Sequence, residues 1–268
     1  LGENLGQQVL IDNRAGASGI IGTEMAVKAP PDGYTLVTGI ASTITTNQLL
    51  NKMNYDPVKD LAPVSLLTRG FLVLVVRPTF PPKTLQDFVE QARAQPGKLN
   101  YASWGNGSAT HLAMELFKRR VGIELNHVPY KGTAPVLNDL MGGQIDVTFE
   151  TTNPTIQFIR AGRVRPIGVS APMRSPFLPE VPAIAETFPG FKVASWGAVL
   201  APLATPKEIV QRLSGEFAKI IRNPAMQARL RELGSEPVSS TPEELAQLIR
   251  EDFELWSKVV KDTGIKAD

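Results

Sequence analysis

Apolar residues in the first third of the chain follow two alternating patterns. Residues 8–13, 33–40 and 71–78 are short apolar runs of the kind that form buried strands. Residues 19–29 and 84–97 repeat their apolar positions at helical spacing, and the second segment opens on a threonine cap and stops at Pro-Gly. This order predicts strand–helix–strand units.

The alternation continues through a second block and then gives way to helices. Strand patterns at residues 99–103, 125–130 and 145–150 alternate with helical patterns at residues 109–122 and 134–143. From Thr205 onward, two long helical patterns each begin with Thr-Pro and an acidic first turn, which is a helix-start signature. We expect an α/β fold with mainly parallel sheets covered by helices.

Composition narrows the possible chemistry. The 268 residues carry Lys+Arg 28 against Asp+Glu 26, and a net charge of +2 is no nucleic-acid footprint. No apolar run approaches the roughly 20 residues of a membrane-spanning helix, so we expect no direct membrane insertion. With Cys 0 and His 2, thiol chemistry is excluded and a protein-built metal site is disfavoured. We expect no cofactor, no metal and no nucleic-acid partner.

Three glycines follow the first strand pattern, and their spacing argues against a nucleotide site. Gly16, Gly19 and Gly22 read G-x-x-G-x-x-G, whereas a dinucleotide site needs G-x-G-x-x-G and a phosphate loop needs G-K-[ST]. We interpret them as a tight strand-to-helix turn, in which Gly22 permits close packing.

A second glycine loop, "SWGNGSATH", offers donors for an anion. If Ser108 caps the following helix, its hydroxyl and the first free amides of the helix converge at the positive helix end. Gly105 and Gly107 let the backbone approach a ligand closely. The predicted carboxylate contacts of this loop are Ser103, Asn106, Gly107, Ser108, Ala109, Thr110 and His111.

Residues 39–48 repeat this arrangement after another strand, with the hydroxyls of Ser42 and Thr43 near a predicted helix start. Ligands of open α/β sheets bind beyond the carboxyl ends of strands, where both loops fall. We therefore predict Ser42 and Thr43 as further ligand contacts. Ordinary helix capping is the alternative explanation for either loop alone.

A hydrolytic α/β enzyme is the alternative function. Ser103 and Ser108 lie close in sequence to His111, but a serine hydrolase also needs an elbow that presents the serine and an acid that orients the base. Neither is identifiable. His111 either contacts a ligand or caps local backbone groups, and His127, in a strand pattern, is interpreted as structural.

Several blocks of the sequence resemble one family in order along the whole chain. They include "DNRAGASGIIGTEMAVKAPPDGYTLVTG", "PGKLNYASWGNGSATHLAMELFK" and "HVPYKGTAPVLNDLMGGQIDVTFE". The chain is similar to the Bug family (TctC-like), the extracytoplasmic solute-binding proteins of tripartite tricarboxylate transporters. The resemblance implies a periplasmic, non-enzymatic protein that captures a small carboxylate-bearing metabolite, and we expect a monomer whose partners are the membrane components of the transporter.

The resemblance also implies a type II periplasmic-binding-protein (Venus flytrap) fold, in which two lobes close on the ligand. We place lobe one at residues 1–99 plus 198–268 and lobe two at residues 100–197. Family members begin with a strand, a glycine-rich loop and a helix that have no counterpart in this chain, so we expect lobe one to lack one carboxylate-binding loop.

Two positions depart from the family pattern. Glu150 stands where relatives commonly have an aspartate, and we predict that it contacts the ligand, orients water or caps a helix. Trp104 occupies a position expected to be small, and it either lines the cleft or covers the hinge.

Overall fold

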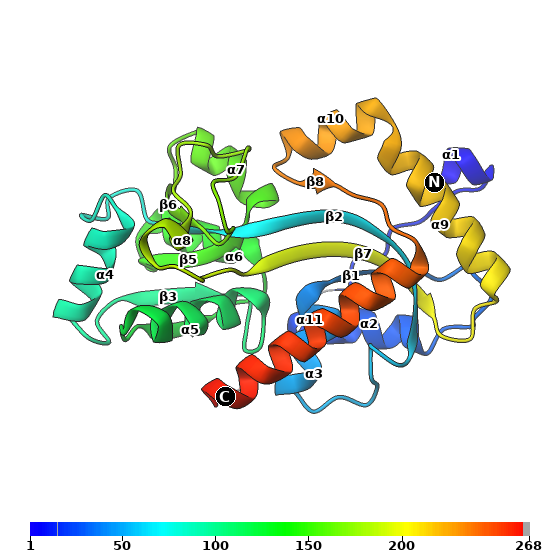
Figure 1. Ribbon diagram of the computed structural model, residues 1–268, viewed down its shortest axis with the longest axis horizontal. Helices are drawn as coiled ribbons and strands as arrows, with labels where there is room; N and C mark the ends of the chain where they lie inside the picture. The colour runs from blue at the N-terminus through cyan, green and yellow to red at the C-terminus, as the bar shows by residue number, and fades with distance from the viewer. Residues whose placement is uncertain (15, 265–268) are drawn as a thin grey trace. The chain divides into compact units, whose positions relative to one another are not determined.

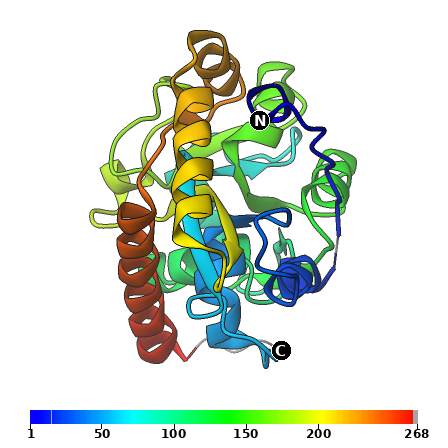
Figure 2. The same ribbon diagram turned by 90° about the vertical axis from the view of Figure 1, so that its right-hand side faces the viewer.

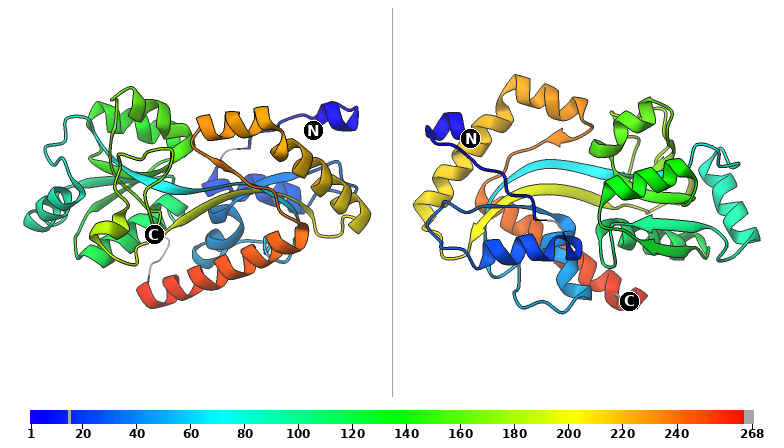
Figure 3. Two further views of the ribbon diagram at one scale, coloured as in Figure 1. Left: turned by 45° about the horizontal axis from the view of Figure 1, so that its top comes forward. Right: turned by 180° about the vertical axis from the view of Figure 1, so that it is seen from behind.

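The computed structural model describes residues 1–14 and 16–264, which fall into two compact units. Unit 1 comprises residues 1–69, 196–231 and the part from 236 onward, and unit 2 comprises residues 70–195 and 232–235. Two strands, β2 (Leu61–Val76) and β7 (Ala194–Pro202), run through both units. They are neighbours in the strand order and run side by side in Figures 1 and 3.

The described part of unit 1 combines four strands with helices. Strand β1 (Val37–Ile40) pairs antiparallel with β7, and the short β8 (Glu236–Pro237) pairs antiparallel with β2. Its helical segments are α1 (Gly2–Leu5), η1 (Ala17–Gly19), α2 (Ile20–Val27), η2 (Ser42–Thr46), α3 (Asn47–Leu50), α9 (Lys207–Arg222), α10 (Pro224–Glu232, whose last residue falls in unit 2) and α11 (Pro242–Thr263).

Helices α9 and α11 cover the strands of unit 1 (Figure 2). Leu245 of α11 packs in one cluster with Leu66 of β2 and Leu200 of β7. Val210 of α9 packs in a second cluster with Val199 of β7. Because these apolar side chains are buried, they fix both helices on the sheet.

Unit 2 is a mixed sheet with helices packed against it. Its strands follow the order β6-β2-β5-β3-β4, in which β3 (Asn100–Ser103) is parallel to β4 (Asn126–Pro129) and to β5 (Val147–Thr151). Strand β2 is antiparallel to both β5 and β6 (Arg165–Val169). The helices are α4 (Leu85–Ala94), α5 (Ala109–Val121), α6 (Thr133–Gly142), α7 (Thr152–Arg160) and α8 (Ile184–Thr187).

An aromatic cluster anchors α5 in unit 2. The ring of Phe117 on α5 lies 6.4 Å from that of Phe88 on α4 and 6.1 Å from that of Phe149 on β5. It also lies 6.1 Å from the ring of Phe188 and 5.7 Å from that of Phe191. These contacts join α5 to the strand that carries Glu150.

The prediction of mainly parallel sheets is wrong. Parallel pairing joins β3 to β4 and β5, whereas β2 is antiparallel to β5, β6 and β8, and β7 is antiparallel to β1. Alternating helices and strands do predict parallel pairs where the chain stays in one unit. Strand β2 passes from one unit to the other and does not follow that rule. Parallel pairing requires a crossover connection, usually a helix, that brings the chain back to start in the same direction, and no such helix links β2 to the strands it pairs with.

The structure divides the chain at positions other than those predicted. The prediction assigns residues 70–99 to lobe one, but they belong to unit 2. The reason is the pairing of residues 72–76 of β2 with β5, which fixes the second half of β2 and the following α4 in unit 2. The other boundary lies between Ser195 and Trp196 and not at residue 197.

The predicted strand at residues 8–13 is absent from the structure. Leu10 and Ile11 are each 80% exposed, and the segment pairs with no strand among the described residues. An apolar run forms a strand only when a neighbouring strand takes up its hydrogen bonds. Within the described part of the chain, no helix has both the length and the apolar composition that crossing a membrane requires.

Candidate functional site

The glycine loop between β3 and α5 folds as the sequence predicts. Gly105 and Gly107 have φ angles of 113° and 77°, values that L-residues with a side chain rarely adopt. Ser108 is the N-cap of α5, and its Oγ accepts a hydrogen bond from the amide of His111 at 3.3 Å. The loop therefore delivers its backbone to the positive end of a 13-residue helix that has no acidic residue in its first turn.

Of the two hydroxyl protons of Ser108 and Thr110, one remains free to donate at the start of α5. Their oxygens lie 3.1 Å apart, Thr110 also accepts from the amide of Trp104, and Ser108 accepts from that of His111. Whichever hydroxyl donates to the other, the second proton has no acceptor among the contacts of the described residues. The amides of Ala109 and Thr110 lie in the first turn, where no preceding turn supplies carbonyl acceptors. Together these groups form a donor-rich candidate site for an anion.

The side chain of Ser103 forms hydrogen bonds with the backbone of the glycine loop. Its Oγ donates to the carbonyl of Gly105 at 3.2 Å, accepts from the amide of Gly105 at 3.1 Å and lies 2.7 Å from Nε2 of His127. The His127 ring stacks on the rings of Tyr101 and His111, whose centroids lie 4.7 Å and 4.4 Å from its own. This arrangement agrees with a structural role for His127, and a direct ligand contact of Ser103 stays a prediction.

The contacts of His111 do not match a serine nucleophile with its base. Nδ1 of His111 accepts from the amide of Gly107 at 3.1 Å, and Ser108 Oγ accepts from the backbone of His111. The ring thus caps a local backbone group, which was one of the two interpretations of this residue. Ser103, the other candidate nucleophile, contacts the ring of His127 instead.

Glu150 is fully buried and engaged by two protein donors. The indole Nε1 of Trp104 lies 3.0 Å from both carboxylate oxygens, and the hydroxyl of Thr133 donates to Oε2 at 2.9 Å. Burial raises the pKa of Glu150 to about 8, although the hydrogen bonds from Thr133 and Trp104 oppose the rise. Glu150 therefore holds Trp104 in place, and its predicted contact with a ligand stays a prediction.

Unit 1 carries the second predicted set on η2, a π-helical turn that follows β1. The Thr43 hydroxyl accepts from the amide of Ile40 and donates to its carbonyl, both at 3.0 Å, so it caps the end of β1. Ser42 is 3% exposed. π-Helical turns occur frequently at functional sites.

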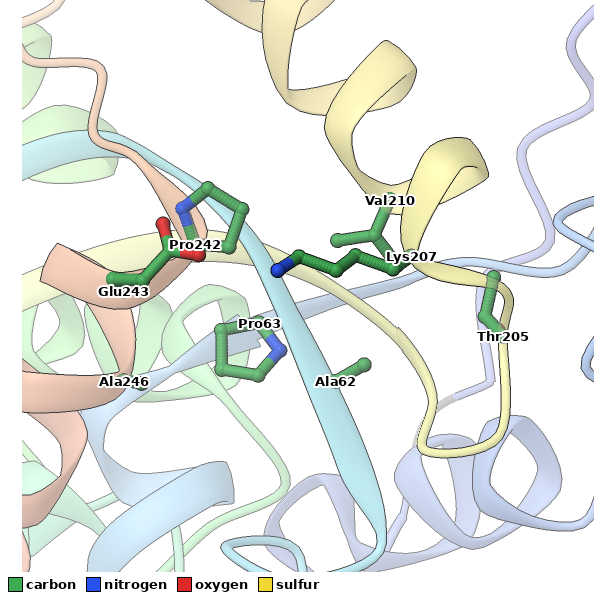
Figure 4. A pocket seen from close by; sticks show the side chains of 8 residues that line it. All are labelled: Ala62, Pro63, Thr205, Lys207, Val210, Pro242, Glu243 and Ala246. Atoms are coloured by element: carbon green, nitrogen blue, oxygen red, sulfur yellow. The ribbon is translucent and has the colours of Figure 1, made fainter.

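Unit 1 also has a hollow of about 290 Å³ that does not include the predicted site residues. Its lining is mostly aliphatic and consists of Ala62, Pro63, Thr205, Lys207, Val210, Pro242, Glu243 and Ala246. Figure 4 shows the Lys207 side chain extending over β2 towards Pro242 and Glu243. None of the predicted site residues lines this hollow. Within the described residues, no group of three or more His, Cys, Asp or Glu side chains is placed to hold a metal.

Comparison with known proteins identifies a family model and several similar structures. The model described as the tripartite tricarboxylate transporter family receptor, TctC, matches residues 1–265. The structure of R. palustris Rpa4515 with adipate has a TM-score of 0.96 and 37% sequence identity, over 99% of this chain and 89% of that one.

Two further structures are also similar. MatC from Rhodopseudomonas palustris with bound malate has a TM-score of 0.91 and 33% identity, over 97% of this chain and 90% of that one. The periplasmic binding protein BugD has a TM-score of 0.93 and 32% identity, over 99% and 90%.

Proposed function

Because the chain belongs to the tripartite tricarboxylate transporter receptor (TctC/Bug) family, we propose that it is a periplasmic receptor that binds a small carboxylate-bearing metabolite. Receptors of this family are non-enzymatic binding proteins, so the hydrolase alternative with Ser103, Ser108 and His111 is wrong. The membrane components of the transporter are the partners that would receive the ligand.

The start of α5 carries this proposal. One hydroxyl proton from the Ser108–Thr110 pair and the first-turn amides of Ala109 and Thr110 meet at a positive helix end. A carboxylate satisfies all of these donors at once, and neither an arginine nor a metal is needed. Asn106, Gly107 and His111 complete the loop around it.

A dicarboxylate is the ligand class that we favour. Adipate and malate, the ligands of two similar structures, each carry two carboxylates. We assign one carboxylate to α5 of unit 2, and a ligand contact of Ser42 and Thr43 in unit 1 stays a prediction. Hydroxyl and amide donors recognise the carboxylate group and select weakly among the bodies of different dicarboxylates.

Ser108→Ala is expected to weaken adipate or malate binding about tenfold or more, because a charge-assisted hydrogen bond is worth on the order of 1.5–3 kcal/mol. Calorimetric titration measures the dissociation constant. Thr84→Ala is the matched control, since Thr84 is the N-cap of α4 in the same unit. It removes a helix cap of equal kind without touching α5.

Equal weakening by both substitutions would mean that loss of a cap, and not loss of a ligand contact, lowers the affinity. Unchanged affinity in Ser108→Ala would remove Ser108 from the site. If the unaltered protein binds neither dicarboxylate, the ligand class is wrong.

A further inference from the structure

Asp252 on α11 contacts η2, the turn that carries Ser42 and Thr43. Its Oδ2 lies 2.6 Å from the hydroxyl oxygen of Thr45, which is fully buried in η2. The same hydroxyl oxygen lies 2.6 Å from the backbone carbonyl of Ala41, one turn earlier. Both distances are at the short end of the range for hydroxyl hydrogen bonds.

These two contacts require two protons. The Thr45 hydroxyl has a single proton, yet both of its partners are oxygens that ordinarily accept. If Asp252 were ionised, one of the two oxygen pairs would face each other at 2.6 Å without a hydrogen between them. A proton on Oδ2 removes the conflict, since Asp252 then donates to Thr45 and Thr45 donates to Ala41.

The surroundings of Asp252 extend the pH range over which it stays neutral. Burial raises the pKa of this carboxyl, and polar contact with Thr45 and with the indole N–H groups of Trp196 and Trp256 opposes the rise only in part. These facing groups come from η2, β7 and α11, and none of the three is charged.

We propose that Asp252 is a positioning residue that carries a proton on Oδ2 and donates it to Thr45, thereby fixing the η2 turn. The turn begins at Ser42, two residues after Ile40, whose backbone is capped by Thr43. Fixing Thr45 therefore holds Ser42 and Thr43 in one conformation before a ligand arrives. The effect on ligand affinity rests on the proposed function, whereas the proton on Asp252 does not.

The sign of the pH effect follows from the hydrogen bonds. When Asp252 loses its proton, its carboxylate accepts a hydrogen bond from the Thr45 hydroxyl, and the carbonyl of Ala41 loses its donor. The η2 turn then loosens, so dicarboxylate affinity should fall as pH rises through the titration of Asp252. Asparagine mimics the protonated acid, because its Nδ2 donates to the Thr45 oxygen at every pH.

A ligand-free fluorescence titration tests the proton directly. Trp104→Phe is the background, because Trp104 contacts the titrating Glu150 and would obscure the signal of Trp196 and Trp256. We expect the emission of this variant to titrate above the ordinary Asp range, and we expect the added Asp252→Asn to abolish that step. A step of the same size and position in both variants would overturn the assignment.

Adipate titration across the same pH range tests the positioning role. Asp252→Asn and Thr45→Ser should bind like the unaltered protein at the acidic end, and Asp252→Asn should bind without the alkaline loss. Asp252→Ala and Thr45→Val should bind about three- to tenfold more weakly, because the turn must then be ordered on binding. Wild-type affinity in both would overturn the positioning role. If no variant binds adipate or malate while the fluorescence step depends on Asp252, the proposed function fails and the proton assignment stands.

Discussion

Glu150→Gln is expected to remove most of the loss of stability that the unaltered protein undergoes between pH 4.5 and about pH 8. The unfolded chain releases the Glu150 proton near 4.5, whereas the folded protein keeps it until about 8. Across this window the folded state binds more protons than the unfolded state, so the free energy of unfolding falls as pH rises. One pKa unit corresponds to about 1.4 kcal/mol, which makes the total loss on the order of a few kcal/mol.

Urea unfolding at several pH values within and beyond this window measures the effect. The glutamine side chain places a neutral amide at the position of the protonated acid. Its Oε1 can accept from Trp104 and its Nε2 can donate to the Thr133 hydroxyl. Glu124→Gln is the control, because Glu124 is an exposed residue of the same unit. A parallel decline of all three proteins with pH would show that Glu150 does not set the dependence.

The sequence predicted several helices and the conformation of the glycine loop before α5 because their signals are local. Thr84, Ser108 and Thr241 each cap a helix through the bond that their position implies. The loop glycines reveal themselves in the same way, since positive φ angles at Gly105 and Gly107 are a property of the chain over a few residues. In contrast, Thr205 of the other Thr-Pro start is not a cap, because the N-cap of α9 is Pro206.

Contacts between distant segments carry no such local signal. Trp104 and Thr133 meet Glu150 only after β3, β5 and α6 have packed, so Thr133 escaped the prediction. Asp252 and Thr45 are separated by 207 positions, and the sequence around neither residue predicts their contact. The division of β2 between two units is likewise set by its distant partners, which are β8 in unit 1 and β5 and β6 in unit 2.

Phe117→Ala is expected to lower the free energy of unfolding by about 3–5 kcal/mol, the usual cost of deleting a buried phenylalanine ring. Phe117 is fully buried, and its ring faces those of Phe88, Phe149, Phe188 and Phe191. Deleting it leaves a cavity beneath α5, the helix that Ser108 caps. Chemical unfolding measures the loss, and Phe117→Leu, which refills part of the space, should lose less.

Phe117→Ala also tests whether the aromatic cluster affects adipate affinity at the start of α5, apart from its effect on the stability of the fold. Ligand binding stabilises a folded protein by about 2.7 kcal/mol at a hundredfold excess over the dissociation constant. Saturating adipate should therefore restore part of the stability of Phe117→Ala. If the aromatic cluster also fixes the start of α5, the folded variant binds adipate more weakly, and the restoration at a given adipate concentration is smaller than in Phe117→Leu. Unaltered affinity in folded Phe117→Ala would show that the cap and loop of α5 hold the site without the cluster.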